Sequence, residues 1–304
     1  MSSDHEVSSS ESGGHGYIPS QKSAIIFIAI FALSTIAHIV QLSKKRTWFM
    51  IQTIVLCGVL ESVGWGGRLW MHYEPESGIA FNIQIVLLIL GPTPLLAANF
   101  VIFGRIIRRL GQRYSRMRPR MYTIIFVSCD VISLGIQGAG GALAASADDL
   151  EGANKGAKIM LGGIVFQLVV IVVYSVLGLE YFVRFIQDRP IGRTASTALD
   201  EKALNPQGLV KRDQVRLTRK IKMMLFALVF TTVLLFIRAI YRTLELAEGW
   251  EGRIIQTELY FDVLDGAMIV LAIFTFNVAH PGWLLELSEE EQYKESFSSD
   301  DESA

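Results

Sequence analysis

Charge is scarce in this chain of 304 residues. Only 19% of the residues are Asp, Glu, Lys or Arg, and the formal net charge is −1. Without a basic surplus, the sequence offers no electrostatic basis for nucleic-acid binding. Cysteine is also scarce, since Cys57 and Cys129 are the only two and both lie within apolar runs. That position is typical of small core residues and not of a disulfide framework.

The sequence also lacks the motifs of several membrane-protein classes. It has no GxxxxGK[ST] loop, which excludes an ATP-driven pump for this chain alone. A retinal protein would need a lysine in the last span, yet none lies between Lys222 and Lys294. Beyond the N-terminal tail there are only His38, His72 and His280, fewer and more scattered than a ceramidase-type zinc hydrolase would need. We therefore expect no enzyme activity, no catalytic residue, no metal and no cofactor.

The sequence is instead rich in long apolar segments. Hydrophobic residues make up 51% of it, and the mean hydropathy is +0.39. Seven apolar blocks of about 20 residues or more are long enough to cross a bilayer. They lie near residues 22–42, 48–70, 80–103, 121–145, 157–183, 221–244 and 254–279. The sequence thus predicts an all-α membrane protein with a seven-helix domain over residues 20–283. Disordered tails are expected at residues 1–19 and 284–304.

The loops between these blocks differ in charge. The first, third and fifth are basic (SKKRT, GRIIRRLGQRYSRMRPR and residues 184–220), while the others are short and acidic or nearly neutral. Positive loops stay in the cytoplasm, which predicts an outer N-terminus and a cytoplasmic C-terminus. No cleavable signal peptide is visible, so the first block is expected to act as an uncleaved anchor.

Several polar residues fall inside the predicted spans. Glu61 and Arg68 are seven residues apart and share a helical face, as do Asp130 and Gln137. The third span contains Pro92, which with Pro94 frees backbone carbonyl groups near the middle of the membrane. That pair predicts either a simple kink or a hinge whose carbonyl groups face a substrate.

The densest group of ionisable residues lies in a predicted hairpin of the last two spans. Its members repeat the spacing i, i+4, i+7, and they are Arg238, Arg242 and Glu245 on one helix and Glu258, Asp262 and Asp265 on the other. Ionisable groups inside spans are costly unless they are paired or hydrated. We expect Arg242 to pair with Glu258, and Arg238 to pair with Asp262 or Asp265. The group is either a structural ion-pair lattice or a site that faces Glu61 and Asp130 across the bundle.

Motifs along nearly the whole chain resemble the fungal lipid-translocating exporters, seven-span proteins associated with aminocholesterol resistance. They include GYIPS before the first span, E-x-x-G-W-x-x-R in the second, LLAANFVIFGRII ending the third and FVSCDVISLGIQGAGG in the fourth. The longest is FIRAIYRTLELAEGWEGRIIQTELYFDVLDGAMI, followed by FNVAHPG. Asp262 departs from the family pattern, which more often has an aromatic residue there. The resemblance implies a protein that moves or senses amphiphilic lipids, such as sphingoid long-chain bases or sterol-like compounds.

Two functions remain open. One is translocation or export of amphiphilic lipids, and cationic lipids are possible substrates. Such export would confer resistance to toxic lipophilic compounds. The alternative is a seven-helix receptor or sensor that signals through a cytoplasmic partner. The plasma membrane is favoured over an endomembrane. The candidate substrate-binding or translocation residues are Glu61, Arg68, Asp130, Gln137, Arg238, Arg242, Glu258, Asp262 and Asp265, with Pro92 and Pro94 as candidate hinge residues.

Overall fold

A computed structural model describes residues 17–147, 149–191, 218–249 and 252–285, and the regular structure in these ranges is entirely helical. Seven helical segments there are long and apolar enough to cross a membrane. This confirms the predicted fold class. The single-helix segments are α1 (Gln21–Lys45), α5 (Pro119–Ala145), α6 (Leu150–Ile186) and α8 (Arg219–Glu248).

The other three segments are composite. The second joins η1 (Trp48–Met50), the π-helical η2 (Ile51–Val55) and α2 (Leu56–Tyr73), and the third joins α3 (Gly78–Leu90) to α4 (Pro92–Leu110). The seventh joins α9 (Glu258–Phe261), the π-helical η4 (Asp262–Gly266), α10 (Ala267–Val278) and α11 (Pro281–Leu284). A short 3-10 helix, η3 (Gln112–Tyr114), follows α4.

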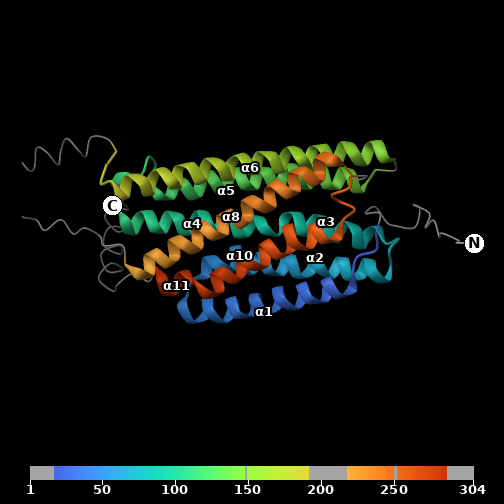
Figure 1. Cartoon of the computed structure of the whole chain (residues 1–304), viewed down its shortest axis with the longest axis horizontal. Coiled ribbons are helices and arrows are strands. Elements are labelled where there is room, and N and C mark those ends of the chain that lie inside the picture. The colour runs from blue at the N-terminus through green and yellow to red at the C-terminus, as the bar shows by residue number, and fades with distance from the viewer. Residues whose placement is uncertain (1–16, 148, 192–217, 250–251, 286–304) are drawn as a thin grey trace, which may run out of the picture.

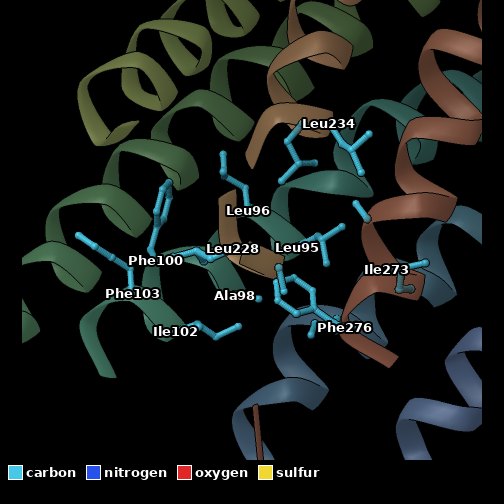
Figure 2. Close-up of a cluster of buried hydrophobic side chains, with 14 of the residues drawn as sticks. Leu95, Leu96, Ala98, Phe100, Ile102, Phe103, Leu228, Leu234, Ile273 and Phe276 are labelled. Atoms are coloured by element: carbon cyan, nitrogen blue, oxygen red, sulfur yellow. The ribbon is translucent and has the colours of Figure 1, made fainter. Parts of the chain in front are cut away.

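The segments form a bundle in which each packs beside its neighbours in the chain. Each helix contacts the next one in the series α1, α2, α3, α5, α6 and α8. Helix α10 contacts both α8 and α1 and so closes the ring (Figure 1). The third segment is the most enclosed, because α4 touches α5, α8 and α2. Its apolar side chains form the centre of the core. Figure 2 shows Leu95, Leu96 and Phe103 of α4 beside residues of α8 and α10.

Small residues bring α5 and α6 close together. A Cβ atom added to Gly156 would lie 2.4 Å from the backbone nitrogen of Ala144, and one added to Gly140 would lie 2.5 Å from that of Met160. Side chains at either position would therefore push the two helices apart. In a bilayer, where apolar surface gains little by leaving lipid, such close backbone contact is a main source of helix association.

The bundle has two ends. The end that holds Tyr17 and the connections near residues 74–77 and 252–257 is called the Tyr17 end below, and the charge of the loops predicts that it faces outward. Residues 1–16 and 286–304 of the predicted tails lie outside the described residues. Residues 17–19, which the composition assigns to the tail, contact the bundle: the Pro19 carbonyl group lies 2.9 Å from Nδ1 of His72.

Candidate functional site: a buried arginine–carboxylate cluster

Asp265 is the centre of a buried ionic cluster between α8 and the last segment. Arg242 grips its carboxylate with two hydrogen bonds, from Nε to Oδ1 and from Nη2 to Oδ2, each 2.8 Å long. Nε of Arg238 lies 2.8 Å from the same Oδ1 as an ion pair. The expected pairing of arginines with carboxylates across the hairpin is therefore present. Such a fork-to-fork contact is the strongest geometry open to an arginine and a carboxylate.

Arg238 also ties the cluster to the broken third segment. Its Nη2 donates a 2.6 Å hydrogen bond to the carbonyl oxygen of Leu88. In a continuous helix this oxygen would accept from the residue four positions on, but that residue is Pro92, which has no N–H. The proline thus frees a carbonyl group near the helix break, as predicted from the sequence. The group is used by the protein's own arginine in this conformation.

The cluster extends along α8 to a second carboxylate. Nη1 of Arg242 donates to Oε2 of Glu245 at 2.8 Å, and the hydroxyl group of Tyr241 donates to Oε1 at 2.9 Å. Both oxygens of this buried carboxylate are therefore occupied. Arg242 also lies against the ring of Phe261, 4.9 Å from its centroid, which covers one face of the guanidinium group.

Glu61 of α2 completes the cluster but is not paired in the same way. Its side chain is fully buried, and neither oxygen has a hydrogen-bond partner among the described residues. Asp265, Arg238 and Arg242 are near enough to act on it electrostatically. The indole N–H of Trp65 lies close to the Glu61 carboxyl group but outside hydrogen-bond geometry. A Cβ atom on Gly91 would lie 2.7 Å from Oε1, so the glycine at the helix break makes room for this carboxyl group.

The charges of the cluster do not balance when all five groups are ionised. Three carboxylates (Glu61, Glu245 and Asp265) face two guanidinium groups (Arg238 and Arg242), and the unpaired group is Glu61. A buried carboxylate without a partner costs several kcal/mol and must take up a proton, water or a cation. This spare acid is the chemical feature that distinguishes the cluster from a closed ion-pair lattice.

One of the predicted pairings is wrong, because Arg242 binds Asp265 and not Glu258. Arg238 also binds Asp265, one of its two expected partners, and Asp262 pairs with neither arginine. The physical reason is η4, the π-helical turn that contains both aspartates. Its wider turn separates side chains that an α-helix would place on one face. Asp265 consequently points into the bundle, while Asp262 is partly exposed and faces Ser23 of α1.

Glu258 has a different partner. Its Oε1 accepts from Nη2 of Arg68 at 3.1 Å and from the backbone N–H of Ser20 at 2.7 Å. The same Nη2 donates to the hydroxyl oxygen of Tyr17 at 3.0 Å. Burial raises the pKa of Tyr17, so its hydroxyl group stays neutral and able to accept this bond. Residues 17–20 of the GYIPS motif are therefore held against the Tyr17 end of the bundle by Arg68 and Glu258.

Asp130 and Gln137 belong to a separate network. Asp130 accepts a 2.7 Å hydrogen bond from Nε2 of Gln167, which lies 3.3 Å from the hydroxyl group of Thr93. Gln137 donates to Ser133 and to Gln167. These bonds join α4, α5 and α6, and within the described part of the chain they are not linked to the arginines by a hydrogen bond or ion pair. The expectation that Asp130 faces the arginine cluster is thus not met.

The space beside the cluster is narrow. A pocket lined by Arg68, Gln84, Arg242 and Glu245 offers about 20 Å³, enough for one or two water molecules and too little for a lipid head group. Any larger occupant requires the helices around it to move. The break at Gly91 and Pro92 is the natural place for such a movement, although a hinge remains a prediction.

Sequence reasoning missed some partners in these networks. Tyr241 is four residues before Glu245, a spacing that could have indicated their hydrogen bond. Gln167, which joins Asp130 to Gln137, is also not among the predicted site residues. At the opposite end of the bundle, the buried His38 and His280 rings lie 6.5 Å apart, and His280 caps α11 by accepting from Gly282. No group of His, Cys, Asp or Glu in the described part of the chain could hold a metal ion.

Fold and cluster together define a seven-helix integral membrane protein with ionised groups held inside its bundle. The chain belongs to the RTA1-like protein family, whose model matches residues 54–288. It is 28% identical to the "Sphingoid long-chain base transporter RSB1" of Saccharomyces cerevisiae, over 88% of this chain and 73% of that protein.

Two further relatives carry the family name. The "Lipid-translocating exporter-like protein RTA1" of Leptosphaeria maculans is 25% identical over 88% of this chain and 50% of its own. "Protein RTA1" of Saccharomyces cerevisiae is 26% identical over 87% of this chain and 84% of its own. No solved structure matches the chain.

Proposed function

We propose that this protein translocates amphiphilic lipids of the sphingoid-base or sterol-like class across the membrane without an ATPase of its own. Its relatives are named as a sphingoid long-chain base transporter and a lipid-translocating exporter. The seven-helix bundle supplies the path, and the role is transport and not catalysis. Export of this kind would confer resistance to toxic lipophilic compounds at the plasma membrane.

The spare carboxyl group of Glu61 carries the proposal. A sphingoid base has a single cationic head group, and the cluster has one more carboxylate than it has guanidinium groups. An ammonium group entering the cluster would balance its charge, whereas an anion would worsen the imbalance. The same carboxyl group could carry a proton on the return step, which would couple lipid movement to a proton gradient.

Access to the cluster requires opening. The arginines hold Asp265 and the Leu88 carbonyl group at the same time, so a movement of α3 against α4 at Gly91 would disturb both contacts together. Rocking of helices about a break near the midplane is how many transporters expose a site alternately to either side. Pro92 and Pro94 are proposed to act as this hinge.

A receptor or sensor is the second candidate. The narrow pocket of about 20 Å³ supports it, because a compact, paired cluster can serve as a two-state switch as well as a transport site. In that case the basic end opposite Tyr17 would dock a signalling partner. A receptor binds the lipid without moving it.

Purified protein in liposomes separates the two functions. A long-chain base with a fluorescent label is placed in both leaflets, and a membrane-impermeant reductant then bleaches the outer one. Translocation predicts bleaching of the inner pool faster than in protein-free liposomes, and Asp265→Asn should abolish the gain. The matched control is Glu76→Gln, which removes an exposed carboxylate at the same end of the bundle. Binding of the base with no gain in bleaching rate would identify a receptor.

Location and orientation need their own test. We propose an outer Tyr17 end and a plasma-membrane location. A tag after residue 304 should react with antibody in intact cells only after permeabilisation, whereas a tag before residue 17 should react without it. The reverse pattern would contradict the orientation drawn from the loop charges.

A further inference from the structure

A second, larger cavity lies on the lipid-facing side of the cluster. It is a groove of about 590 Å³ between α8 and the start of the last segment. Its floor is apolar and includes Ile237, Ile240 and Leu244 of α8 and Leu264 of η4. The volume is in the range of small-molecule sites. The groove is therefore large enough for a ligand that the narrow pocket cannot hold.

The groove has the length and polarity of one leaflet. From Ile237 to Glu248, eleven residues of helix rise about 16 Å, roughly half of a hydrocarbon core that is about 30 Å thick. The deep end is lined by aliphatic side chains, and the end near Tyr17 carries exposed Glu248 and Arg253. An apolar trough with a charged rim at the membrane surface matches a single lipid chain with its head group.

Tyr241 connects the groove to the buried cluster. Its side chain lines the groove, and its hydroxyl group donates to Oε1 of Glu245. The other oxygen of Glu245 accepts from Arg242, which grips Asp265. One side chain thus separates a lipid-exposed cavity from Glu245, the outermost carboxylate of the buried cluster. An amphiphile in the groove would lie one side chain away from the cluster that is proposed to receive its head group.

The charge near the rim favours a cation. Glu248 uses Oε2 to accept from the backbone N–H of Ile254 at 3.1 Å, while its carboxylate stays exposed. Behind the rim, the three buried carboxylates outnumber the two guanidinium groups by one. The fields of these groups add to attract an ammonium head group, although Arg253 opposes them at the surface.

We propose that this groove is the lateral access site for a single-chain amphiphile with an ammonium head group, which binds Glu248 at the rim with its chain along α8. The proposal rests on the proposed function and adds where the lipid passes between the bundle and the bilayer. The leaflet is the one at the Tyr17 end, which the loop charges predict to be the outer one, so in export the groove is the site of release. Tyr241 acts as a positioning residue between this access site and the cluster. The groove faces the bilayer, so the lipid reaches it without crossing water.

The test is photolabelling in lipid nanodiscs with a long-chain base that carries a diazirine in its chain. Labels should be found by mass spectrometry in residues 237–248 and 253–264. Leu244→Trp fills the groove and should lower the labelling at least fivefold. Leu271→Trp, at a lipid-facing position of α10 outside the groove, is the matched control and should leave it unchanged.

Head-group selection is read from the same assay. Glu248→Gln keeps an acceptor for the Ile254 N–H but loses the charge, and it should weaken binding of the long-chain base about tenfold. An uncharged alcohol of equal chain length should bind both forms alike. Stronger labelling of Glu248→Gln than of the wild type, or a tenfold loss in Arg253→Gln with an anionic amphiphile preferred, would overturn the assignment of an ammonium group.

The outcomes separate this inference from the proposed function. Translocation in liposomes with labels confined elsewhere, for example in the 210 Å³ groove beside Tyr174 and Gly178, would refute the access site and leave translocation standing. Labels in residues 237–248 without translocation would support the groove as a receptor site. Equal labelling of wild type, Leu244→Trp and Leu271→Trp would show nonspecific contact with membrane lipid and would refute the groove.

Discussion

Replacing Glu61 by Gln and Asp265 by Asn should have unequal effects on stability, although both changes should impair transport. Both changes remove one carboxylate from the cluster and keep the shape of the side chain. Asp265 makes three contacts of 2.8 Å with two buried arginines, whereas Glu61 has no hydrogen-bond partner among the described residues. Comparing the two variants therefore distinguishes the effect of removing one negative charge from the effect of breaking the ion pairs of Asp265.

The magnitudes follow from burial. Removing one partner of a buried ion pair costs about 3–5 kcal/mol, because the remaining charge stays in a poor solvent. Asp265→Asn should lower the melting temperature in detergent on the order of 10 °C, at a few degrees per kcal/mol. Glu61→Gln breaks no ion pair, so its effect should stay within about 1 kcal/mol.

Transport separates the variants from mere folding defects. Glu61→Gln brings the cluster to neutrality and should slow movement of a cationic long-chain base about 10- to 150-fold, the value of one charge-assisted hydrogen bond of roughly 1.5–3 kcal/mol. Movement of an uncharged amphiphile should be unaffected. The assays are thermal unfolding of the purified protein and bleaching in liposomes, with Glu76→Gln as the control. Destabilisation by Glu61→Gln equal to that by Asp265→Asn would refute the reasoning, because it would mean that Glu61 is paired.

Three further predictions concern the supports of the cluster. Pro92→Ala supplies an N–H for the Leu88 carbonyl group and should slow transport while melting stays equal or rises; unchanged transport would exclude a hinge there. Gly156→Leu should separate α5 from α6 and lower stability by at least about 1–3 kcal/mol, whereas a normal melting curve would contradict the close packing. Arg68→Gln should release the segment at Tyr17, seen as faster hydrogen exchange of residues 17–20; unaltered exchange would show that Arg68 does not hold it.

The sequence predicted some parts of the site and not others, and the difference has a local cause. Hydropathy predicts all seven spans, because a helix that crosses a bilayer needs about 20 consecutive apolar residues and these can be recognised in the sequence. Proline chemistry is equally local, so the freed carbonyl group near Pro92 could be predicted. The partners of Asp265 could not, because they depend on the π-helical turn of η4. Nothing in the letters DVLDG states that the helix widens there.

Asp130 illustrates the same limit on a larger scale. Its helical face could be read from the spacing to Gln137, but not the helix that this face meets. The packing of Gly140 and Gly156 brings α5 against α6, so Asp130 meets Gln167 and not an arginine. The spacing of residues along one helix shows which of them share a face of that helix. Only the packing of the seven helices decides which neighbouring helix that face contacts.

The sequence by itself determined that this is a seven-span helical membrane protein with arginines and carboxylates placed inside the bilayer. These properties follow from length, hydropathy and helical spacing within single segments. The tertiary structure alone decided which charges pair, that Glu61 is left over, and that a lipid-facing groove lies one side chain away from the cluster. Those outcomes depend on contacts between residues as far apart as Glu61 and Asp265, and such contacts exist only once the helices have packed.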